Sequence, residues 1–109
     1  MANRNLYKLE MLLLKVLESG DYYGYQLAQS LKELSQGQLH ISEGTMYPIL
    51  YKLTEQGLIS DYTRLIKKRQ TRVYYHLEET GKQHLEELIK DYYEMTDAIQ
   101  RILGPREHS

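Results

Sequence analysis

Five basic side chains fall within the nine-residue stretch RLIKKRQTR: Arg64, Lys67, Lys68, Arg69 and Arg72. No acidic residue occurs between Asp61 and Glu78, so this positive charge is locally unbalanced. Guanidinium and ammonium groups are the side chains that proteins use to bind phosphate oxygens. The whole chain has 14 basic and 15 acidic residues, so its net charge gives no argument for an anionic partner. A solvated loop would also explain such a cluster if it stood alone.

A second stretch of interest is SEGTMYPILYKL, from Ser42 to Leu53, which has a helical pattern with Pro48 inside it. Its apolar residues recur at i, i+3, i+4 and i+7, which predicts one buried stripe. Ser42 is the predicted N-cap, and Pro48 then falls in the second turn, where proline costs up to ~3 kcal/mol. The alternative is a helix that starts near Thr45, which makes Pro48 a harmless first-turn residue.

The face of this helix opposite the stripe is predicted to contact DNA. A residue that breaks a local rule is typical of a functional surface, and Gly44 allows a phosphate to approach the backbone closely. The predicted contacts on this helix are Ser42, Gly44, Thr45, Tyr47, Pro48, Tyr51 and Lys52.

Two earlier helices are predicted to support this one. Apolar spacing indicates a helix over residues 6–17, and a second helix with Asp21 as N-cap and Leu27, Leu31 and Leu34 on its apolar face. Three short helices of this kind, the third after a short turn, predict a helix-turn-helix.

A two-stranded ribbon is predicted next, over residues 58–65 and 72–77, because β-branched and aromatic residues dominate both segments. The basic cluster forms the loop between these strands. Beside a helix-turn-helix, we interpret the cluster as a DNA-binding wing, and not as a solvated loop.

The last segment is a long helix, with Thr80 and Gln83 in capping-box spacing at its start and Gly104 at its end. Its apolar residues step by three and four, which is a heptad seam. From Leu85 to Leu103 the seam spans about 27 Å at roughly 1.5 Å per residue, so a second copy is expected to cover it. The alternative is packing against the first helix of the same chain. The predicted dimerisation residues are Leu9, Leu13, Leu85, Leu88, Tyr92, Met95, Ile99 and Ile102.

The expected fold is therefore mainly α with a small β-hairpin. Residues 1–77 form a winged helix-turn-helix DNA-binding domain, and residues 78–109 form the C-terminal dimerisation helix and a short tail, all in one compact unit. Two recognition helices held by a dimer would enter successive major grooves about 34 Å apart.

Several stretches resemble the PadR family of bacterial transcriptional regulators, named for control of phenolic-acid detoxification. They are Gly24-Tyr25, SEGTMYPIL from Ser42, QGLI from Gln56 and RVYYHLEETGK from Arg72. The single C-terminal helix resembles the short branch of the family. The resemblance implies a homodimeric repressor that binds a pseudo-palindromic double-stranded operator and is released by a small aromatic or amphipathic effector. We also expect Tyr25 to contact DNA. The family wing usually has glycines before its arginines, and this wing has none, so the resemblance leaves its tip undefined.

The resemblance also implies an effector pocket. In some members of the short branch, a tryptophan on the C-terminal helix stacks flat aromatic compounds at the dimer centre. This chain has no tryptophan, and Tyr92 falls at the matching place with Tyr93 beside it. We expect Tyr92, Tyr93 and Ile89 to line the pocket.

Other functions find little support in the sequence. His84 and Glu87 have metal-compatible spacing but no third ligand, so we expect no metal site. No set of nucleophile, base and orienting residue occurs, and no phosphate loop, so we expect neither an enzyme nor a cofactor. The absence of cysteine fits a reducing compartment, and no apolar run reaches about 18 residues, so we expect a soluble cytoplasmic protein without a membrane partner. The alternative function is a winged-helix adaptor that binds proteins and not DNA.

Overall fold

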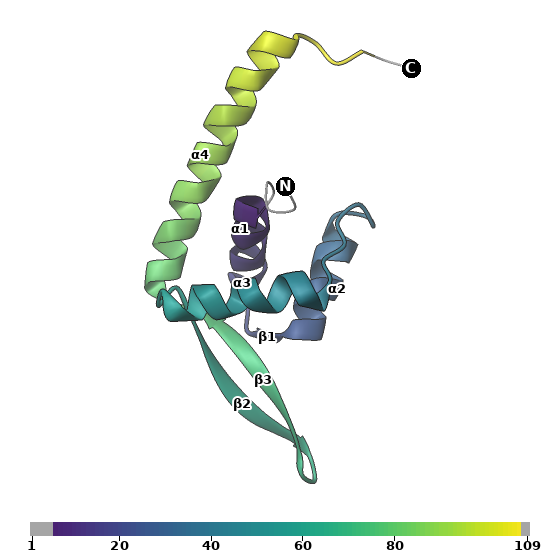
Figure 1. Ribbon diagram of the computed structural model, residues 1–109, viewed down its shortest axis with the longest axis vertical. Coiled ribbons are helices and arrows are strands. Elements are labelled where there is room, and N and C mark those ends of the chain that lie inside the picture. Colours follow the sequence, from purple (N-terminus) through teal and green to yellow (C-terminus); the bar gives the residue numbers. More distant parts are fainter. Residues whose placement is uncertain (1–5, 108–109) are drawn as a thin grey trace.

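The computed structural model describes residues 6–107 of the chain, with side chains from residue 8 onward. The elements are α1 (Leu6–Leu17), β1 (Tyr22–Tyr23), α2 (Gly24–Leu34), α3 (Glu43–Glu55), β2 (Ile59–Lys67), β3 (Gln70–Leu77) and α4 (Glu79–Leu103). In Figure 1, α1, α2 and α3 form the body, the β2–β3 hairpin projects from one end, and α4 rises toward the other. The expected winged helix-turn-helix with a long C-terminal helix is confirmed.

One hydrophobic core joins the three helices of the body to the base of the hairpin and to the start of α4. Leu13, Leu27 and Leu53 have no exposed surface, and Ile59 and Leu85 are 1% exposed. The stripe predicted for α3 is confirmed, since its four members, Met46, Ile49, Leu50 and Leu53, are all buried. The apolar face predicted for the second helix is wrong at Leu34, which is 76% exposed because α2 ends there.

The sheet has three antiparallel strands in the order β1-β3-β2, where the sequence predicted two. The additional strand is only two residues long, and Tyr22 and Tyr23 lie opposite Tyr75 and Tyr74. A two-residue strand is too short to produce a periodic pattern. It nevertheless attaches the wing to the turn that precedes α2.

The start of α2 differs from the prediction. Tyr23 is the N-cap residue, and its backbone N–H donates to Gln26 Oε1 at 3.1 Å. Asp21 is not the cap, because its carboxylate accepts hydrogen bonds from the wing strands.

The first turn of α4 is bonded to the turn that ends α3. The backbone N–H of Glu78 donates to the Leu58 carbonyl at 3.0 Å, and Thr80 Oγ1 donates to the Gly57 carbonyl at 2.6 Å. Gly81 is buried against the same turn, where a Cβ would overlap the Leu58 carbonyl oxygen. Thr80 was expected to cap α4, but the helix already begins at Glu79 and the Thr80 hydroxyl serves this long-range bond. The end of α3 and the start of α4 therefore meet directly, in a contact between residues 57–58 and 78–81 that we call the joint.

Candidate DNA-binding interface

Ser42 begins α3 as the sequence predicts. Its Oγ accepts a hydrogen bond from the Thr45 backbone N–H at 3.3 Å. Because the helix starts at Glu43, Pro48 lies in the second turn, and the alternative start near Thr45 is wrong. Proline has no N–H, so the carbonyl of Gly44 lacks the helical donor that it would otherwise have.

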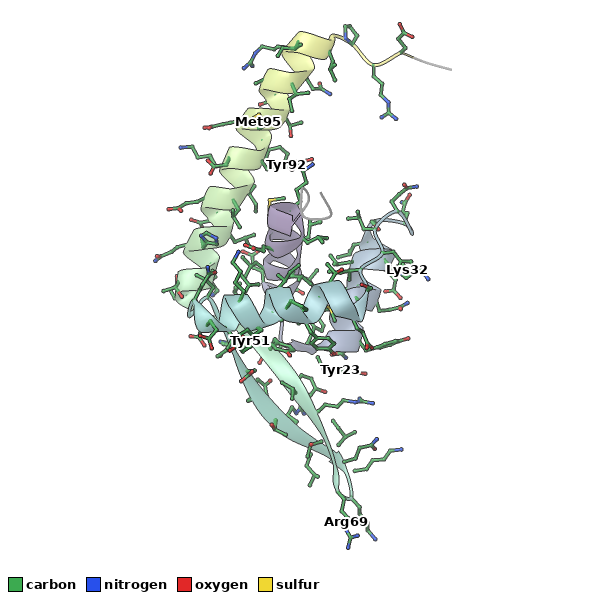
Figure 2. The ribbon with its side chains drawn as sticks, viewed as in Figure 1. Tyr23, Lys32, Tyr51, Arg69, Tyr92 and Met95 are labelled. Atoms are coloured by element: carbon green, nitrogen blue, oxygen red, sulfur yellow. The ribbon has the colours of Figure 1, made fainter. Side chains whose placement is uncertain are left out.

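The outer face of α3 is open to solvent. Thr45 and Pro48 are exposed, Tyr51 is 68% exposed, and a Cβ at Gly44 would meet only Ser42 Oγ, at 4.0 Å. In Figure 2, Tyr51 lies on the side of α3 from which the wing extends, and Arg69 marks the wing tip. The outer face of α3 and the wing thus lie on the same side of the molecule.

Tyr47 is less free than its neighbours on α3. It is 42% exposed, and its hydroxyl packs against Gly24 at the start of α2, where a Cβ would overlap it. This contact explains the glycine before Tyr25, which is itself 68% exposed. Tyr47 therefore helps to set how α2 and α3 pack, although part of its side chain stays exposed.

Lys52 has a partner that the sequence did not reveal. Its Nζ donates to Glu10 Oε2 on α1 at 2.7 Å. The Glu10 side chain is only 11% exposed, whereas that of Lys52 is 55% exposed. The role of Lys52 in DNA binding stays a prediction, and the structure adds a second role, because the Lys52 charge compensates a nearly buried carboxylate.

The wing tip is a tight turn at Lys68 and Arg69. Arg69 has φ 59°, which lies in the left-handed region that favours glycine. The strand register is irregular between Leu65 and Lys67, which absorbs the extra residue. All three tip cations, Lys67, Lys68 and Arg69, are exposed.

The two remaining wing arginines lie directly opposite each other, at Arg64↔Arg72. Each guanidinium covers a tyrosine ring: Arg64 lies 4.9 Å from the centre of Tyr74, and Arg72 lies 4.3 Å from the centre of Tyr23. Sequence reasoning identified the arginines but not the tyrosines beneath them. The sequence feature that could have indicated these tyrosines is the repetition of the pairs Tyr22-Tyr23 and Tyr74-Tyr75.

Asp21 joins this cluster from the turn before β1. Its carboxylate accepts a hydrogen bond from the Tyr62 hydroxyl at 2.7 Å and lies 2.8 Å from His76 Nδ1. Burial acts to raise the pKa of Asp21, but the hydrogen bonds from Tyr62 and His76 hold it below its usual value. The bond to Asp21 in turn raises the pKa of Tyr62.

A model of the PadR-like transcriptional regulator family matches residues 13–87, which include the end of α1, all of α2 and α3, the wing and the first turns of α4. The chain belongs to this family. PadR-like proteins are transcriptional regulators and not enzymes.

Individual proteins and solved structures are also similar to this chain. The Escherichia coli protein "Transcriptional regulator YqjI" is 36% identical over 80 residues, which cover 73% of this chain but only 37% of that protein. The structure of smu.1704 from Streptococcus mutans UA159 is 36% identical, with a TM-score of 0.73 and coverage of 94% of this chain and 93% of that one. The structure of Bacillus subtilis PadR in complex with operator DNA is 28% identical, with a TM-score of 0.69, and the match covers 74% of this chain and 46% of that one.

In this PadR-like chain, the seam on α4 divides into two halves. Leu85, Leu88 and Tyr92 pack against the core of their own chain, whereas Met95, Ile99 and Ile102 are 58%, 45% and 83% exposed. Figure 1 shows the same division, because α1 lies beside the lower part of α4 and the upper part stands clear. Within the first half, the alternative of packing against the same chain is correct.

Two predicted dimerisation residues have to be corrected. Leu13 is fully buried and Leu85 is 1% exposed within the single chain, so neither has surface to offer a second copy. Both belong to the core because α1 faces the body on one side and α4 on the other. Leu9 is partly buried and remains at the edge of the core.

The residues predicted to bind an effector do lie together. A half-open groove of about 850 Å³ runs between α1, residues 38–40 and α4, and its lining includes Leu9, Leu12, Ile89, Tyr92 and Tyr93. The rings of Tyr92 and Tyr93 meet edge to face with their centres 5.4 Å apart. In Figure 2, Tyr92 projects from α4 toward the side on which α1 lies.

Among the described residues, none of the helices combines the length and the apolar character that crossing a lipid bilayer requires.

Proposed function

We propose that this chain is a sequence-specific DNA-binding regulator that acts as a cytoplasmic homodimeric repressor on a pseudo-palindromic operator. The observation that carries the DNA-binding step is the shared orientation of the exposed α3 face and the basic wing. A recognition helix in the major groove and wing cations on phosphates use that arrangement directly. The similar Bacillus subtilis PadR, in complex with operator DNA, supports the proposal.

The test is footprinting on the DNA upstream of the gene that encodes the chain, followed by titration of the protected duplex. Tyr51→Ala is expected to weaken binding while the melting temperature stays within about 2 °C, since an exposed side chain contributes little to stability. Leu34→Ala is the control, because Leu34 is a similarly exposed apolar residue, at 76%, at the end of α2 and outside the predicted DNA, dimer and effector contacts. If the native protein protects no DNA and shows no salt-dependent binding, the adaptor function replaces this proposal.

The homodimer part of the proposal rests on the exposed half of α4. Isolated apolar residues on a surface are ordinary, but Met95, Ile99, Ile102 and Leu103 form one stripe on a helix that stands clear of its own core. A second copy of the same helix fits such a stripe in the manner of a coiled coil. Ile99→Glu is expected to give a monomer by sedimentation, and Gln100→Glu, which adds the same charge beside the stripe, is expected to leave a dimer. A native protein that sediments as a monomer would refute this part.

Release by a ligand is the third part of the proposal, and the groove beside Tyr92 supports it. A second copy would close this half-open groove, and a ligand held there would change the angle between subunits and so the spacing of the recognition helices. Phenolic acids and planar aromatic compounds are titrated into the native protein and Tyr92→Ala, with operator binding measured alongside. Equal affinity for both proteins would reduce Tyr92 to a seam residue, and no binding to either would remove the effector.

A further inference from the structure

Two like charges lie opposite each other on the wing. Arg64 and Arg72 are directly paired across β2 and β3, and both side chains are exposed. Opposed like charges repel, so two free guanidiniums here would swing apart. Instead, each lies over an aromatic face, Arg64 on Tyr74 and Arg72 on Tyr23, at distances at which a cation and a ring attract each other.

The rings beneath the arginines form a continuous row across the sheet. Tyr23 on β1 meets Tyr74 on β3 edge to face with ring centres 5.5 Å apart, and Tyr62 on β2 stacks on Tyr74 at 5.8 Å. The strand register sets this order, because Tyr23 and Tyr62 are both paired with Tyr74. We call Tyr23, Tyr74 and Tyr62 the tyrosine row.

The row is anchored to the body of the domain at its outer end. The Tyr62 hydroxyl donates to Asp21, which His76 also contacts, and Asp21 lies in the turn between α1 and β1. Tyr74 is only 9% exposed, so its ring is a support and not a surface for DNA.

We propose that Tyr23, Tyr62 and Tyr74 are positioning residues that hold Arg64 and Arg72 ready to bind DNA phosphates. The inference rests on the proposed DNA-binding function. A guanidinium stacked by its face keeps its edge N–H groups free for a bidentate phosphate contact. It also loses less side-chain freedom on binding, which amounts to about three- to tenfold in affinity for each arginine.

The test is a double-mutant cycle in the full chain with a mixed-sequence DNA duplex, which suffices because phosphate contacts carry little sequence information. Tyr23→Leu is expected to lower affinity about three- to tenfold, while the slope of log K against log salt stays constant because Arg72 still reaches its phosphate. Tyr23→Phe keeps the ring and should bind like the native protein. In an Arg72→Ala background, Tyr23→Leu should have no further effect.

Other outcomes contradict the proposal. The same loss in the Arg72→Ala background would mean that Tyr23 contacts DNA itself or only maintains the fold. No loss in the native background would mean that the stack does not contribute. If Tyr23→Leu lowers the melting temperature strongly, Tyr62→Leu provides a second cycle, measured with Arg64 present and with Arg64→Ala. Tyr62 supports the Tyr74 ring that lies beneath Arg64, and at 39% exposure it is less important for the core than Tyr74.

A measurement without DNA separates this inference from the proposed function. The Arg72 Nε–H resonance should carry a ring-current shift that Tyr23→Leu removes and Tyr23→Phe preserves. A native protein that keeps this shift but binds no DNA would refute the proposed function and retain the stack. A native protein that binds DNA but lacks the shift would refute the tyrosine row.

Discussion

The ion pair between Lys52 on α3 and Glu10 on α1 makes a prediction about stability. Lys52 Nζ and Glu10 Oε2 are 2.7 Å apart, and the Glu10 side chain is 11% exposed. Lys52→Met keeps the long apolar stem but removes the ammonium, which leaves the carboxylate nearly buried without its partner. Stability should therefore fall, even though Lys52 itself lies mostly on the surface.

The size of the effect follows from the exposure of the two side chains. Breaking a fully buried pair costs about 3–5 kcal/mol, whereas an exposed pair is worth about 0–1 kcal/mol. Lys52 is 55% exposed, so water screens the pair substantially and the expected loss is about 1–2 kcal/mol. In a domain of this size, each kcal/mol lowers the melting temperature by about 4–8 °C.

Thermal and urea unfolding of Lys52→Met measure this loss. Lys15→Met is the matched control, because Lys15 forms an equally short pair with Glu18, 2.8 Å apart, whose side chains are 60% and 41% exposed. The control should lose much less stability, because water screens a pair in which both side chains are exposed. The double variant Glu10→Gln, Lys52→Met should recover part of the loss, because no unpaired charge remains. Equal effects of Lys52→Met and Lys15→Met would refute the reasoning.

Three further predictions concern the joint, the wing and Asp21. Gly81→Ala should destabilise the fold by about 2–4 kcal/mol in urea unfolding, because its Cβ meets the backbone of Leu58 and α4 has to move; an unchanged midpoint would show that the joint is loose. Lys67→Gln with Lys68→Gln should weaken binding to all DNA sequences alike and lower the salt slope by about 0.9 per lost contact, and an unchanged slope would remove these lysines from the interface. The hydrogen bonds to Asp21 stabilise the folded state fully above the ordinary pKa of 3.8, and this stabilisation is lost as the pH falls through the lower pKa that Asp21 has in the folded protein. Asp21→Asn should therefore make the free energy of unfolding fall less steeply at acid pH. Parallel curves of this free energy against pH for the two proteins would refute the assignment.

The sequence predicted α3 correctly because all its signals are local. A cap at Ser42, a stripe of period 3.6 and a left-handed residue at Gly57, with φ 75°, agree within one segment. The amide hydrogen bonds from Gly57 and Leu58 back to Thr54 and Leu53 complete a normal helix end.

The missed side-chain partners are mostly residues far apart in the chain. Glu10 and Lys52 are 42 residues apart, and Asp21 is 41 residues from Tyr62 and 55 from His76. No periodic pattern records such a pair, so the same Asp21 that looks like a helix cap is free to serve another element. Thr80 was misassigned for the same reason, since its partner Gly57 lies across a whole hairpin.

The joint at the start of α4 limits how the chain can be altered by insertion or recombination. Only one residue separates β3 from α4, and Gly81 packs the first turn of α4 against Leu58. No flexible linker is therefore present that would let α4 rotate about its own axis. Each residue inserted beyond Gly81 would turn the rest of the helix by about 100°, which moves the stripe at Ile99 and Ile102 away from its present side. Seven residues would restore it to within about 20°. In chimeras that exchange the part of α4 beyond Gly81 between relatives, the stripe should therefore stay on the same side when the helix length changes in steps of seven residues. It should move to another side when the length changes by one residue.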